Sequence, residues 1–170
     1  MDVRFVVLSS SHGTTFQAIL DAIADGSLTA RFLGLVADRL DRGCVEKAKR
    51  AGTPVAVVER RPGESADHYD DRLHTVITGL GNVDVIAAIG WMYILTPAFI
   101  RKWRGRILNV HPALLPKHGG RGMFGKRVHE AVLQADEQES GMTIHVMDEE
   151  VDTGTILHQV RCLVLPGDTP

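Results

Sequence analysis

Short apolar runs alternate with amphipathic helical segments along most of this 170-residue chain, and this alternation constrains the fold more than any other feature. The first run, residues 3–9, is continuous and β-branched, which is typical of a parallel strand covered on both faces. Further strands are expected at residues 31–37, 54–58, 83–88, 107–111, 143–146 and 156–165, and helices at residues 16–26, 44–51, 67–80, 97–103 and 127–135. Strand and helix alternate as far as about Ala135. This order predicts an α/β fold with a doubly wound, mostly parallel sheet.

The composition favours one small globular domain that handles small molecules. Lys and Arg number 19 and Asp and Glu number 21, so the net charge of −2 argues against nucleic acid as the main partner. No apolar run approaches the roughly 18 residues that a membrane span needs, so no membrane partner is expected. Cys44 and Cys162 lack Cys-x-x-Cys spacing, and the N-terminal segment has no basic and apolar leader pattern. These features predict buried thiols and a cytoplasmic protein.

A loop of small residues follows the first strand. In doubly wound sheets, ligands bind beyond the carboxyl ends of the strands, so this loop is a candidate site. Gly13, Thr14 and Thr15 lie where it enters the first helix, and their backbone N–H groups and hydroxyls suit a phosphate or carboxylate. The loop matches neither Gly-x-Gly-x-x-Gly nor a Walker A motif. The alternative interpretation is ordinary helix capping by Thr14 or Thr15.

The most informative stretch ends the strand at residues 107–111. Asn109 and His111 lie two residues apart and therefore share one face of that strand, where Pro112 then stops the ladder. An amide and an imidazolium on one face can hold a developing oxyanion, and the imidazole can also pass a proton to a leaving group. The alternative is a structural histidine whose hydrogen bonds are satisfied inside the fold.

An acidic turn follows at residues 148–154. Asp148, Glu149 and Glu150 fit a solvated loop, whereas Asp152 precedes a Thr-Gly turn and an apolar strand. A carboxylate at Asp152, if it lay near His111, would favour the protonated imidazole and orient the ring.

These motifs together resemble the folate-dependent formyltransferases, and within them the glycinamide ribonucleotide branch. The similarity runs in the right order through residues 13–19, 90–97, 108–116, 141–145 and 151–159, which is nearly the whole chain. The Asn-x-His-Pro-Ala-Leu-Leu-Pro element with the later Asp-x-Gly carries most of the specificity. The resemblance implies a Rossmann-like formyltransferase fold and a single domain over residues 1–170.

The resemblance also implies the chemistry and the site. The amine of glycinamide ribonucleotide would attack the formyl carbon of 10-formyltetrahydrofolate, a step of purine biosynthesis that uses no metal. Asn109 and protonated His111 would stabilise the oxyanion, His111 would help to protonate the departing nitrogen, and Asp152 would orient His111 and order a water. Gly13, Thr14 and Thr15 match the loop that holds the ribonucleotide phosphate. The folate pocket is matched by Met92, Tyr93, Ile94 and Leu95, together with Asn109 and the turn of Asp148, Glu149, Glu150, Val151 and Asp152.

The chain departs from the family pattern in several places. The first loop has Ser11-His12-Gly13-Thr14-Thr15 where Gly-Asn-Gly-Ser-Asn is common, and Tyr93 stands where an arginine is common. The loop at residues 117–126 is long and glycine-rich, so it is either a mobile lid or a plain connector. Family members continue with a further helix beyond the match to Pro170, so a C-terminally truncated domain is expected.

Four alternatives remain open at this stage. One is a formyltetrahydrofolate hydrolase that delivers water instead of an amine, and another is a methionyl-tRNA formyltransferase, which the charge and the absent basic domain disfavour. A third is a non-catalytic remnant that binds folate or nucleotide. The fourth is a histidine metal site, which no pair of histidines supports by its spacing. The expected partners are therefore glycinamide ribonucleotide and folate, with a monomer or homodimer as the assembly.

Overall fold

The computed structural model describes residues 2–170 as two compact units, of which the first ends at Lys102 and the second is Trp103–Pro170. The first unit contains a parallel sheet in the order β3-β2-β1-β4. Its strands are β1 (Arg4–Ser9), β2 (Arg31–Ala37), β3 (Val55–Val57) and β4 (Val85–Ala88). Its helices are α1 (Thr14–Ala24), α2 (Gly43–Arg50), α3 (Ala66–Gly79) and α4 (Pro97–Lys102).

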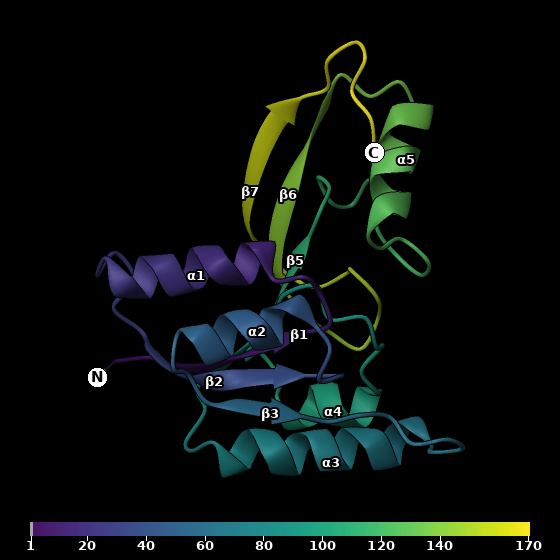
Figure 1. Ribbon diagram of the computed structural model, residues 1–170. Coiled ribbons are helices and arrows are strands. Elements are labelled where there is room, and N and C mark those ends of the chain that lie inside the picture. Colours follow the sequence, from purple (N-terminus) through teal and green to yellow (C-terminus); the bar gives the residue numbers. More distant parts are fainter. Residues whose placement is uncertain (1) are drawn as a thin grey trace. The chain divides into compact units, whose positions relative to one another are not determined.

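Helices cover both faces of this sheet. α1 and α2 lie on one side of it, and α3 and α4 lie on the other (Figure 1). The central strand β1 is buried on both faces, since Val6, Val7 and Leu8 are fully inaccessible to solvent. The continuous apolar run at residues 3–9 is therefore explained, and the predicted doubly wound α/β architecture is confirmed.

The second unit is an antiparallel ladder with one helix. It consists of β5 (Ile107–His111), α5 (Lys126–Gln134), β6 (Glu139–Val146) and β7 (Ile156–Leu163). Both β5 with β6 and β6 with β7 pair antiparallel. β6 begins four residues before the predicted start at Thr143, because the ladder with β7 already opens at the pair Glu139 and Leu163. The alternating pattern of an antiparallel strand is a weaker signal in the sequence than the continuous apolar run of a parallel strand. The start of β6 was therefore predicted less accurately.

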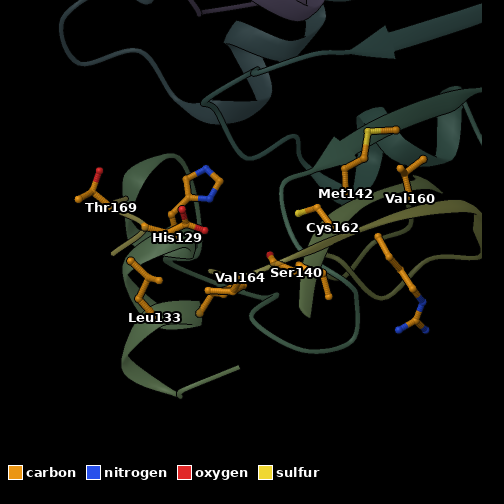
Figure 2. A pocket seen from close by; sticks show the side chains of 13 residues that line it. His129, Leu133, Ser140, Met142, Val160, Cys162, Val164 and Thr169 are labelled. Atoms are coloured by element: carbon orange, nitrogen blue, oxygen red, sulfur yellow. The ribbon is translucent and has the colours of Figure 1, made fainter. Parts of the chain in front are cut away.

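A groove of about 350 Å³ opens in the second unit, between α5 and the strands β6 and β7 (Figure 2). His129 and Leu133 of α5 face Met142 of β6 and Cys162 of β7 across it (Figure 2). None of the residues that sequence analysis assigned to a site lines this groove. The groove is therefore separate from the candidate site described below.

Gly141 in β6 is expected to be essential for the packing of the second unit. A Cβ atom at this position would collide with the main-chain carbonyl of Val160 in β7 and would come within 2.9 Å of Leu114. We expect Gly141→Ala to lower the free energy of unfolding by about 2 kcal/mol or more, because a backbone oxygen cannot rotate away. Gly79→Ala is the matched control, since a Cβ there meets no atom within 4 Å. Chemical denaturation measures both, and equal stabilities would contradict the packing argument.

Candidate active site

The cross-strand register of β5 and β6 builds the centre of the candidate site. It places Asn109 opposite His145 and His111 opposite Thr143. Directly opposed side chains on one face of an antiparallel pair lie close together, and Nδ2 of Asn109 accordingly lies 3.1 Å from Nε2 of His145. His111, Thr143 and His145 are all buried. Polar side chains of this kind are buried only where they have hydrogen-bond partners, so the cluster is a specific polar centre in an apolar unit.

Asp152 reaches this centre from the turn before β7. One carboxylate oxygen, Oδ2, lies 3.5 Å from Nδ1 of His111 and accepts a 2.9 Å hydrogen bond from the main-chain N–H of Gly120. The other oxygen, Oδ1, lies 3.5 Å from Nε2 of His145. Asp152 adopts a left-handed backbone conformation with a φ of 61°, which aspartate tolerates better than most residues. The structure therefore brings together the predicted trio of Asn109, His111 and Asp152.

The surroundings of Asp152 favour its charged form. Burial acts to raise the pKa of this carboxyl group. The nearby imidazole of His145, the hydrogen bond from the N–H of Gly120 and the charge of His111 together outweigh the burial, so the pKa of Asp152 lies below its ordinary value. Asp152 therefore supplies a fixed negative charge beside two imidazoles at neutral pH.

Thr143 fixes the chain that leaves β5. Its hydroxyl donates a 2.7 Å hydrogen bond to the carbonyl of Ala113 and accepts a 3.0 Å hydrogen bond from the N–H of Leu115. Gln159 of β7 also donates to this hydroxyl, at 2.9 Å. The turn that follows His111 is thus held from the neighbouring strands, which fixes where the imidazole lies.

The rest of the acidic turn lies at the surface. Asp148, Glu149 and Glu150 are exposed, and Val151 is half-buried. Oδ1 of Asp148 accepts hydrogen bonds from the N–H of Glu150 and from the hydroxyl of Thr153, which shapes the turn. These contacts agree with the solvated-loop interpretation of the three acidic side chains. Their predicted contact with folate remains a prediction.

In the first unit, the loop after β1 enters α1 without a side-chain cap. Gly13 is the N-cap residue, and Thr14 and Thr15 are exposed in the first turn. The alternative that Thr14 or Thr15 caps the helix is therefore wrong, because α1 begins at Thr14 and both threonines lie inside its first turn. Gly13 has a φ of 78°, and a Cβ there would lie 2.8 Å from Cα of Cys44, so only glycine fits. The open N–H groups of this turn keep the capacity to bind an anion.

The predicted folate segment lies against this same loop. The N–H of Ser10 donates to the carbonyl of Gly90 at 3.0 Å, and the N–H of Met92 donates to the hydroxyl of Ser10 at 3.3 Å. Met92 and Ile94 are exposed, whereas Leu95 is buried in the core. The ring of Tyr93 packs against Tyr69, with a centroid distance of 5.2 Å. The two segments that sequence analysis selected in this unit are therefore neighbours.

The parts that His145 and Thr143 play were not predicted from the sequence. Both lie on β6 at alternate positions, so both face the same side as Asn109 and His111. In the sequence, the two residues appear only as polar positions that alternate with apolar ones. The strand register is needed to show which side chains of β5 they lie beside.

Among the described residues, no group of three or more His, Cys, Asp or Glu side chains is arranged to hold a metal ion. No described helix is both long and apolar enough to span a membrane.

The fold and this polar centre define a member of the formyl transferase family, to which the chain belongs: the family model matches residues 3–170. The chain is 37% identical to the chloroplastic phosphoribosylglycinamide formyltransferase of Arabidopsis thaliana, over 98% of this chain and 57% of that protein. It is 38% identical to the trifunctional purine biosynthetic protein adenosine-3 of Drosophila pseudoobscura pseudoobscura, over 97% of this chain.

A solved structure supports the same family membership. The crystal structure of glycinamide ribonucleotide transformylase 1 from Symbiobacterium toebii superposes with a TM-score of 0.90 at 32% identity, covering 99% of this chain and 76% of that one. The chain spans only part of its relatives, with 57% of the plant protein and 12% of the insect protein covered.

Proposed function

We propose that this chain transfers the formyl group of 10-formyltetrahydrofolate to the amine of glycinamide ribonucleotide, as a step of purine biosynthesis. The observation that carries the proposal is the convergence of Asn109, His111 and Asp152 in one cluster around the buried side chains of His111 and His145. Family membership and the names of the relatives point in the same direction.

The side chains of the cluster suit this reaction. The amine nitrogen forms a bond to the formyl carbon, and the formyl oxygen becomes an oxyanion that the Asn109 amide and the protonated His111 stabilise. The bond to N10 of the folate then breaks. N10 receives a proton that His111 helps to deliver, and the attacking amine loses one, so charge and atoms balance. Asp152 orients the imidazole and holds the water through which the proton leaves.

Two segments of the first unit supply binding contacts in this proposal. Gly13, Thr14 and Thr15 hold the ribonucleotide phosphate, since the first turn of α1 offers open N–H groups and two exposed hydroxyls. The exposed side chains of Met92 and Ile94 contact the folate. Tyr93 and Leu95 of the first unit are further proposed folate contacts, as are residues 148–152 of the second unit. The protein acts on small molecules in the cytoplasm, as a monomer or a homodimer forming one formyltransferase domain.

One assay tests the proposal against its rivals. The chain is incubated with 10-formyltetrahydrofolate alone, with glycinamide ribonucleotide added, and with other amines in its place, while release of tetrahydrofolate is followed. We expect release that depends on the ribonucleotide. Equal release without any amine would establish a hydrolase instead. Folate binding measured by calorimetry, with no turnover under any condition, would establish a non-catalytic binding protein.

A further inference from the structure

The main chain of the glycine-rich loop contacts both ionisable members of the cluster. The carbonyl oxygen of His118 lies 2.8 Å from Nε2 of His111. Two residues later, the N–H of Gly120 donates to Oδ2 of Asp152 at 2.9 Å. The predicted role of this loop as lid or connector accounts for neither contact. The loop therefore acts on the candidate site through its backbone.

The first of these contacts decides which nitrogen of His111 carries a proton. A carbonyl oxygen only accepts hydrogen bonds, so Nε2 of His111 must be the protonated nitrogen that donates to His118. Nδ1 then faces Oδ2 of Asp152 across 3.5 Å, which is longer than a direct N–H···O hydrogen bond. Nδ1 is thus the nitrogen left to exchange a proton with a substrate or a water.

A side-chain cluster holds the His118 carbonyl in place. Nε2 of His118 lies 3.2 Å from Oε1 of Glu137, and Nζ of Lys117 lies 2.9 and 3.0 Å from the two oxygens of the same carboxylate. Hydrogen bonds from Lys117 and His118 lower the pKa of Glu137, so it is charged at neutral pH. His118 has a φ of 54°, a left-handed conformation that is unfavourable for histidine on its own. The contacts with Glu137 stabilise that conformation.

We propose that Glu137 is a positioning residue: it holds the His118 backbone so that its carbonyl fixes Nε2 of His111 and leaves Nδ1 as the reacting nitrogen. This inference rests on the proposed function. The ion pair of Glu137 with Lys117 is partly exposed. Such a partly exposed pair contributes little to stability, so its effect is expected in the orientation of the imidazole.

Glu137→Ala tests the proposal, with Glu139→Ala as the matched control. A cavity of about 240 Å³ is lined by His118, Glu137 and Glu139. Glu139 lies two residues from Glu137, but it pairs with Arg161 at 2.8 Å and not with His118. Two-bond ¹H–¹⁵N correlation spectra of the full chain report which nitrogen of His111 is protonated. Measured at a pH at which the His111 ring is neutral, the spectra should show a fixed Nε2–H signature in the wild type and in Glu139→Ala, and averaging of the two tautomers in Glu137→Ala.

Kinetics give a second readout. We expect kcat to fall about 10-fold in Glu137→Ala with the KM values nearly unchanged, since a misplaced catalytic group slows chemistry more than binding. Glu137→Gln keeps an acceptor for His118 and should restore most of the rate. If Glu137→Ala does not fold, His118→Asn replaces it, because asparagine tolerates the left-handed backbone but does not reach Glu137.

Two results would overturn the proposal. One is a His111 spectrum identical in Glu137→Ala and in the wild type, and the other is an equal loss of kcat in Glu137→Ala and Glu139→Ala. Failure of the proposed function is seen separately, as absence of formyl transfer in the wild-type chain. The tautomer measurement still decides the role of Glu137 in that case, because it requires no turnover.

Discussion

His111→Ala should lower the rate of formyl transfer by about 10³-fold at saturating substrates, the largest loss expected from any single substitution in this chain. The imidazole is both a donor to the oxyanion and a source of the proton for N10 in the proposed reaction, and alanine replaces neither. His111 is buried between Asp152 and the His118 carbonyl, so no other described imidazole occupies the same place. Single-turnover and steady-state rates with 10-formyltetrahydrofolate and glycinamide ribonucleotide measure the loss.

The control for this substitution is His158→Ala. His158 lies on β7 and is exposed. Its replacement removes one imidazole but leaves the side chains of the cluster unchanged. Circular dichroism should show that both variants keep the fold. If His111→Ala retained near-full turnover, the assigned mechanism would be refuted.

Asp152→Asn should lower kcat by about 10²-fold. Asparagine keeps the shape, tolerates the left-handed backbone and still accepts the hydrogen bond from Gly120, so only the negative charge beside His111 and His145 is removed. Asp168→Asn is the control, because Asp168 is an exposed carboxylate of the same unit, accepts the N–H of Leu165 and is not one of the assigned site residues. A kcat for Asp152→Asn equal to that of Asp168→Asn would contradict a catalytic role for this charge.

The same variant has an expected signature in stability. The pKa of Asp152 is lower in the folded protein than its ordinary value, so its ionisation stabilises the fold above the ordinary carboxyl pKa. That stabilisation is lost as the pH falls through the lower, folded-state pKa. Thermal unfolding should therefore show the wild type above Asp152→Asn at pH 7, with the difference shrinking below about pH 4. A difference that stays constant with pH would contradict the ionic origin of the effect.

Local sequence pattern was sufficient for the first unit because its strands are buried on both faces. Val6, Val7 and Leu8 form a run that cannot be mistaken for a one-sided strand, and Gly13 marks a point where two backbones approach closely. The second unit was harder to predict. In β6, Thr143 and His145 alternate with apolar residues, and alternation gives no information about which partner strand they face.

The sequence by itself determined the class of fold and the family resemblance, because strand periodicity and short motifs depend on residues that are near one another in the chain. The resemblance in turn predicted the trio of Asn109, His111 and Asp152. Only the tertiary structure decided that His145 joins the trio, that the His118 carbonyl selects the tautomer of His111, and that Glu137 anchors that carbonyl. These contacts join residues up to 36 positions apart through strand register and a left-handed backbone turn, which no local pattern specifies.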